Sequence, residues 1–73
     1  MERTFAMRLS ELRKNSGTSQ KEAAIGLGVS QALLSHYENG IRECGLDFVR
    51  RASEYYGVTS DYLLGLSSSK KGL

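Results

Sequence analysis

Two short helix signals separated by a glycine lie between Ser19 and Gly40. Ser19 and Glu22 have the spacing of a capping box, in which each side chain satisfies the other residue's backbone N–H. Gly28 can adopt the left-handed conformation that ends a helix, and Ser30 can cap the start of the next one. The segment is therefore predicted to fold as two helices joined by a tight turn.

The second of these helices is expected to turn Leu34 and Tyr37 inward. Its outward face then carries four small or polar side chains: Gln31, Ala32, Ser35 and His36. Two helices connected in this way form a helix-turn-helix, a unit whose second helix enters the DNA major groove. Glutamine can pair with two atoms of adenine, and a small apolar side chain can contact the methyl group of thymine. We interpret these four residues as candidate base contacts.

Three further helices fit the rest of the chain. They are expected over residues 5–14 with Thr4 as the N-cap, over residues 46–56, and over residues 59–64 with Thr59 as the N-cap. The apolar spacing predicts a single core, made of Phe5, Leu9, Leu12, Ala24, Leu27, Leu34, Tyr37, Leu46, Val49, Ala52 and Tyr56. The predicted fold class is all-α, with five short helices around that core, and the absence of proline suits it.

Length and charge set the domain organisation. The 73 residues allow one domain, expected over residues 1–66, followed by a flexible tail over residues 67–73 with the composition of a linker. The formal net charge is +2, but Lys70 and Lys71 supply this excess, because residues 1–69 balance eight basic against eight acidic side chains. A basic surface for nucleic acid therefore has to come from local clustering.

The chain offers little other chemistry. With one cysteine and one histidine, it can form no internal disulfide, and neither a metal site nor a catalytic triad can be assembled. We expect no enzyme activity, no cofactor and no small-molecule ligand. The lone Cys44 fits a reducing compartment, and the sequence has neither a signal peptide nor the run of about 18 apolar residues that marks a membrane span. A cytoplasmic protein without membrane contact is expected.

Three more segments carry a family resemblance together with Ser19–Gly40. They are Arg8–Arg13, Tyr37–Gly40 and Gly57–Gly65. In order and spacing, the chain resembles the phage repressor and Cro-type helix-turn-helix proteins, also called lambda-repressor-like or Xre-type, over nearly all of its expected folded part. The resemblance implies a compact five-helix DNA-binding domain with a central helix-turn-helix.

The resemblance also implies roles for residues outside the reading face. Gln20 would clamp a phosphate and brace the reading helix. Asn39 and Arg42 would meet the phosphates of the opposite strand. Independently of the resemblance, we expect Ser30 to contact a phosphate in addition to capping its helix. These residues would set the register of the protein on the duplex.

Arg13 and Glu38 match a family pair that forms a buried salt bridge between the first and third helices, and breaking such a pair costs about 3–5 kcal/mol. The chain departs from the family in having no lysine or arginine between Ser30 and Asn39. It also places Gly26 inside a helix, at a cost of about 1 kcal/mol relative to alanine. Phosphate affinity therefore has to come from other elements.

The resemblance implies sequence-specific binding of double-stranded DNA as a transcriptional regulator, and we expect a repressor. The expected form is a homodimer on a palindromic operator with half-sites about 10 base pairs apart. The resemblance suggests the fifth helix and the region Leu63–Leu66 as the dimer surface. Two alternatives stay open. One is a protein-interaction or antitoxin-like module with weak DNA affinity, which the neutral body favours, and the other is the DNA-binding end of a longer regulator.

Overall fold

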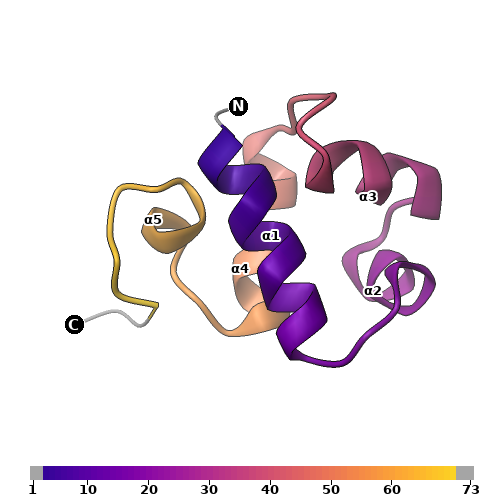
Figure 1. The fold of residues 1–73 in the computed structure, drawn as a ribbon, viewed down its shortest axis with the longest axis horizontal. Coiled ribbons are helices and arrows are strands. Elements are labelled where there is room, and N and C mark those ends of the chain that lie inside the picture. The colour runs from indigo at the N-terminus through magenta and orange to yellow at the C-terminus, as the bar shows by residue number, and fades with distance from the viewer. Residues whose placement is uncertain (1–2, 71–73) are drawn as a thin grey trace.

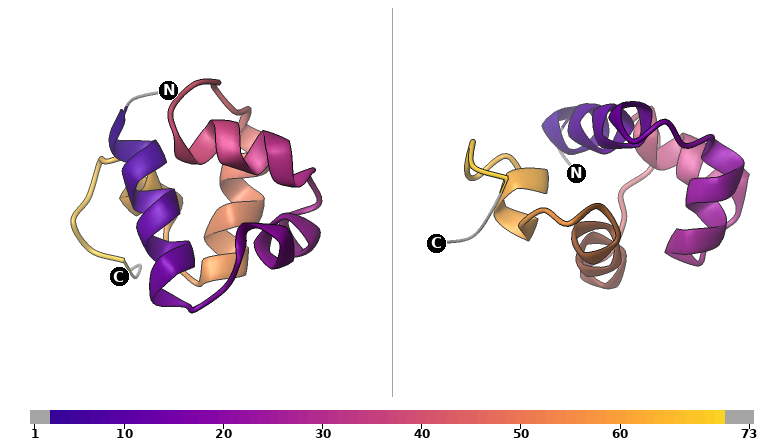
Figure 2. Two further views of the ribbon diagram at one scale, coloured as in Figure 1. Left: turned by 45° about the vertical axis from the view of Figure 1, so that its right-hand side comes forward. Right: turned by 90° about the horizontal axis from the view of Figure 1, so that it is seen from below.

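A computed structural model describes residues 3–70 of the chain. Its elements are five α-helices, and no strand occurs in this range: α1 (Arg3–Asn15), α2 (Gln20–Leu27), α3 (Gln31–Glu38), α4 (Leu46–Tyr56) and α5 (Ser60–Leu63). The helix α1 crosses the middle of the molecule, α2 and α3 lie at one end, and α5 lies at the other (Figure 1). Packing is pairwise, with α1 against α3, α4 and α5, and α2 against α3 and α4 (Figure 2). The prediction of an all-α fold with five helices is confirmed.

Local capping explains where most helices begin and end. The Ser19 hydroxyl accepts from the Glu22 N–H at 3.1 Å, and the Glu22 carboxylate accepts from the Ser19 N–H at 3.4 Å, so the predicted capping box is present. Gly28 ends α2 with φ 75°. The proposed cap at Thr4 is wrong, because α1 begins one residue earlier, at Arg3, and Thr4 lies inside the helix.

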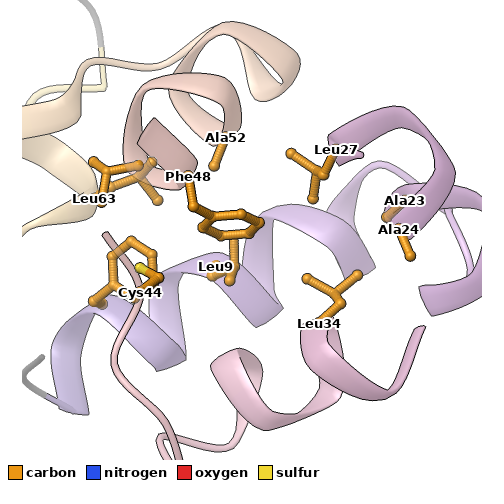
Figure 3. Packing of buried hydrophobic residues seen from close by; sticks show 11 residues of the cluster. Leu9, Ala23, Ala24, Leu27, Leu34, Cys44, Phe48, Ala52 and Leu63 are labelled. Carbon is orange, nitrogen blue, oxygen red and sulfur yellow. The ribbon is translucent and has the colours of Figure 1, made fainter. Parts of the chain in front are cut away.

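The core draws on every helix (Figure 3). Leu9, Leu27, Leu34 and Leu63 have no exposed surface, and burying a leucine side chain contributes about 1.5–3 kcal/mol. The predicted core holds in α1, α2 and α3, where Phe5, Leu9, Ala24, Leu27 and Leu34 are buried, and Leu12 and Tyr37 pack partly buried against them.

The prediction for α4 is wrong at its first residue. Leu46 is 77% exposed, whereas Phe48 is buried beside Val49 and Ala52. Cys44 is not part of the predicted core. It is buried in the core before α4, and burial raises the pKa of its thiol. The predicted inward positions Val49, Ala52 and Tyr56 thus pack in the core, Phe48 takes the place expected for Leu46, and the preceding loop contributes to the core.

Gly26 has a packing reason to be a glycine. A Cβ built at this position would lie 2.3 Å from Cε1 of Tyr55, far inside contact distance. The Tyr55 ring of α4 therefore lies directly on the backbone of α2. The lower helix propensity of glycine is offset in part by this close approach.

Residues 67–70 lie along α5 and contact α1. The Thr59 N–H donates to the Lys70 carbonyl at 2.8 Å. Nη1 of Arg8 donates to the carbonyls of Tyr62 and Ser67, and its guanidinium stacks 4.2 Å from the centroid of the Tyr62 ring. Residues 71–73 of the predicted flexible tail lie outside the described residues, and the flexibility of the tail stays a prediction. Within the range described, no helix has the length and apolar character to span a membrane.

Candidate nucleic-acid interface

The outward face of α3 carries the residues interpreted as base contacts. Gln31, Ala32 and His36 are exposed, and Ser35 is half-buried at the edge of the same face. Leu34 is fully buried on the opposite side, where it anchors the helix to the core. The spacing of 3.6 residues per turn thus separates an anchoring side from a free side.

The N-terminus of α3 is capped and open to solvent. The Ser30 hydroxyl accepts from the Leu33 N–H at 3.1 Å, and Ser30 itself is exposed. A hydroxyl that accepts this bond still has its own proton to donate. The partial positive charge of the helix N-terminus adds to the attraction for an anionic group placed there.

The Glu38 carboxylate joins three helices at one point. Its Oε2 accepts from Nε of Arg13 in α1 at 2.8 Å, and its Oε1 accepts from Nε2 of Gln20 in α2 at 3.1 Å. The side chains of Arg13 and Glu38 are 14% and 3% exposed. The hydrogen bond to Glu38 raises the pKa of Arg13, against the opposing effect of burial. We call Arg13, Gln20 and Glu38 the carboxylate cluster.

The carboxylate cluster fixes the start of α2 relative to the end of α3. Nη1 of Arg13 also donates to the Thr18 carbonyl at 2.9 Å, which holds the loop between α1 and α2. The amide of Gln20 has two N–H donors, and the bond to Glu38 uses one of them. Sequence reasoning missed the contact between Gln20 and Glu38, because a pair 18 residues apart follows no helical period.

A buried tyrosine hydroxyl lies in the field of this cluster. The Tyr56 hydroxyl has no hydrogen-bond partner among the described residues. Burial, and after it the negative charge of Glu38, raises the pKa of Tyr56 to about 12. The hydroxyl is therefore held in its neutral form in the folded state over the physiological range.

The C-terminal end of α3 carries the remaining candidates. The Asn39 amide donates to the Ser35 carbonyl at 2.8 Å and to the Ser35 hydroxyl at 3.3 Å. Arg42 follows in the loop to α4 and is exposed. The structure thus places Gln20 at the start of α2, Ser30 at the start of α3, and Asn39 and Arg42 at and beyond its end.

Comparison with known proteins places this arrangement in a family. Residues 4–66 match the family described as helix-turn-helix domain. The chain belongs to this family.

Two curated relatives of this helix-turn-helix domain come from Bacillus subtilis. The HTH-type transcriptional regulator ImmR is 41% identical over 68 residues, which cover 93% of the chain and 54% of ImmR. The HTH-type transcriptional regulator AnsR is 33% identical over 64 residues, which cover 88% of the chain and 55% of AnsR. The chain spans about half the length of the curated relatives it matches.

A solved structure shares the fold. The N-terminal DNA-binding domain of SinR from Bacillus subtilis superimposes with a TM-score of 0.80 at 26% identity, covering 86% of this chain and 93% of that chain. The resemblance to helix-turn-helix proteins seen in the sequence is therefore confirmed over almost the whole domain.

The helix α3 of this helix-turn-helix domain carries no lysine or arginine. The exposed basic residues closest to it in the sequence are Lys21 near the start of α2 and Arg42 in the following loop. Among residues 3–70, no group of three or more His, Cys, Asp or Glu side chains could hold a metal ion. The candidate interface thus combines an outward face of α3 without lysine or arginine and exposed basic residues that precede and follow α3 in the sequence.

Proposed function

We propose that this domain binds double-stranded DNA sequence-specifically as a transcriptional regulator, with α3 in the major groove. The observation that carries the proposal is the free, neutral face of Gln31, Ala32, Ser35 and His36, on a helix fixed from behind by Leu34 and Glu38. A rigid helix with short polar side chains can approach base edges closely. The proposal is supported by the names of the similar proteins: ImmR and AnsR are named as transcriptional regulators, and the SinR domain as DNA-binding. We propose repression as the mode of regulation.

Phosphate contacts come from the borders of this face. We assign them to the second N–H of the Gln20 amide, to the hydroxyl proton of Ser30 and to Arg42, since all three lie where a backbone would pass beside α3. Asn39 was expected among them, and its amide is bonded to Ser35 in the structure. Within the carboxylate cluster, Arg13 and Glu38 position Gln20 and do not contact DNA themselves.

A second copy of the chain is the proposed partner on a palindromic site. An open groove between α4 and α5 is lined by Leu46, Asp47, Val49, Arg50, Ser60 and Leu64. Leu46 is 77% exposed at its rim, and Asp47 and Arg50 offer opposite charges that a two-fold axis can pair between copies. Leu63, expected in the dimer surface, cannot serve there, because it is fully buried under α5.

Selection of sites from a random duplex library tests the DNA-binding proposal. The wild-type chain is expected to enrich one short sequence, repeated as half-sites about 10 base pairs apart if the dimer forms. Replacement of Arg42 by alanine should weaken binding to all sequences alike and lower the slope of log affinity against log salt by about one unit. If no sequence is enriched and binding to random DNA is undetectable, the DNA-binding proposal is wrong and the alternative of a protein-interaction module is favoured.

The dimer is tested by sedimentation of the chain with and without the Leu46→Glu substitution. A concentration-dependent dimer that Leu46→Glu abolishes is expected, because a charge would have to be buried in the apolar groove. Dimers that persist in the variant would place the contact elsewhere.

A further inference from the structure

A side-chain amide controls the hydrogen-bonding character of one reading residue. Nδ2 of Asn39 lies 2.8 Å from the Ser35 carbonyl oxygen and 3.3 Å from Oγ of Ser35. A carbonyl oxygen can only accept, so the amide atom beside it must be the nitrogen and not the oxygen. The Ser35 hydroxyl oxygen therefore receives a hydrogen bond from Asn39.

The proton of this hydroxyl has no hydrogen-bond partner among residues 3–70. A serine inside a helix often donates to the carbonyl four residues earlier, which here belongs to Gln31. Among residues 3–70, Ser35 makes no such bond, and its only side-chain contact is the one it accepts from Asn39. Accepting one hydrogen bond also polarises a hydroxyl, which makes it a better donor.

The same hydroxyl lies on the reading face. Gln31, Ser35 and Asn39 follow one another at four-residue spacing, so they form one ridge along α3 and the loop that follows it. Ser35 is half-buried between the anchoring side and the exposed residues Ala32 and His36. The Ser35 O–H can therefore donate a hydrogen bond to a group that lies against the exposed face of α3.

We propose that Asn39 is a positioning residue that makes Ser35 a hydrogen-bond donor to a base. This inference rests on the proposed function. In the major groove, guanine offers acceptors at N7 and O6 and thymine offers one at O4, whereas cytosine offers only the N4 donor. Adenine also offers an acceptor at N7, so Ser35 favours guanine, adenine or thymine at the base it faces and disfavours cytosine.

The test uses the selected duplex and its single-base variants in competition binding. Ser35→Ala first identifies the base pair that Ser35 reads, as the one position whose preference relaxes. At this position the wild-type chain is expected to disfavour cytosine about tenfold, as one good contact does, and Asn39→Ala to lower this ratio about threefold without changing other positions. Asn15→Ala, at the exposed end of α1, is the matched control and should change no preference.

Asn39→Asp gives the sharpest outcome. A carboxylate can only accept, so it turns away from the Ser35 carbonyl oxygen and accepts a hydrogen bond from the Ser35 hydroxyl, whose lone pairs then face the base. The preference against cytosine should then be lost or reversed, even though the added negative charge weakens binding to every duplex. Each preference is a ratio measured on one preparation, so a partly unfolded variant does not distort it.

Several outcomes would overturn the inference. If Asn39→Ala weakens all duplexes equally and leaves every base preference unchanged, Asn39 contacts phosphate and does not act through Ser35. If Ser35→Ala relaxes no position while the wild-type chain still selects a site, Ser35 reads no base and DNA binding stands without it. A wild-type chain that selects no site removes both proposals.

Discussion

The outward faces of α3 and α4 differ in chemistry although both are exposed. The exposed face of α4 carries charges, namely Asp47, Arg50, Arg51 and Glu54, as a solvated helix usually does. The exposed residues of α3 are Gln31, Ala32 and His36, with Ser35 at their edge. A neutral face with short side chains can enter a groove without stripping water from ions, which is costly. The two exposed faces thus differ: α3 offers side chains without lysine or arginine, and α4 offers charged ones, of which Asp47 and Arg50 also line the groove beside α5.

The two helices also differ in how they are anchored. The end of α3 is fixed through a buried carboxylate, Glu38, with partners on α1 and α2. The helix α4 is anchored by apolar packing of Phe48, Val49 and Ala52. The orientation of α3 therefore depends on hydrogen bonds to a buried carboxylate. The position of α4 depends mainly on the apolar area that it buries.

The largest expected effect tests this difference in anchoring. Glu38→Ala should lower the free energy of unfolding by about 3 kcal/mol or more, because it leaves the largely buried Arg13 without its partner. The matched change on α4 is Glu54→Ala, which removes an exposed carboxylate and should stay within about 0.5 kcal/mol. Urea unfolding measures both, and equal effects would show that the carboxylate cluster does not anchor α3.

A second test concerns the contact faces. Gln31→Ala should cost about 1–3 kcal/mol of binding free energy on the selected duplex and relax the preference at one base pair. Glu54→Ala should leave the preferred sequence unchanged. Undiminished binding by Gln31→Ala in a titration would remove this residue from the readout.

A third test addresses the contact that joins the two regions. Gly26→Ala should stabilise the wild-type chain by less than the usual gain of about 1 kcal/mol, because the new methyl group forces the 42% exposed Tyr55 side chain to move aside. In a Tyr55→Ala background the same change should stabilise by about 1 kcal/mol, the usual gain of alanine over glycine in a helix. A double-mutant cycle from unfolding curves measures the coupling, and additive effects would contradict the close approach.

The smallest effect concerns the unpaired hydroxyl of Tyr56. Tyr56→Phe should be neutral or stabilise the fold by up to about 1 kcal/mol at pH 7, since the hydroxyl is buried without a partner. The pKa of Tyr56 is raised from 10.0 to about 12, so the unfolded chain loses this proton first and wild-type stability falls as pH rises from 10 toward 12. Unfolding curves at pH 9 and 11 should show a loss of about 1 kcal/mol that the variant does not share. An identical alkaline loss in both proteins would assign it to other groups.

Local signals predicted the region around α2 and α3 well. The capping box at Ser19, the left-handed Gly28 and the cap at Ser30 act within a few residues, and each is present as expected. The exposed positions of Gln31 and His36 followed from the period of α3. Rules of short range suffice where a helix is bounded by its own side chains.

Tertiary contacts decided what sequence patterns missed. Leu46 matched the apolar spacing of α4 but begins that helix over an open groove, where no neighbouring element covers it. Leu63 is buried because α5 packs against α1 and α4, which its four-residue length does not reveal. The bonds from Gln20 to Glu38 and from Asn39 to Ser35 required side-chain geometry, since many polar residues lie at such positions without pairing.

The hydrogen bonds from Arg8 and Thr59 to residues 67–70 determine where a label or linker can be attached. Lys70 is held beside α5, at the opposite end of the molecule from α3 (Figure 1). A dye, an affinity handle or a surface linker attached beyond this residue would depart from the rear of the domain. A protein immobilised through such a linker would thus present α3 to the solution, where it stays accessible to a DNA duplex.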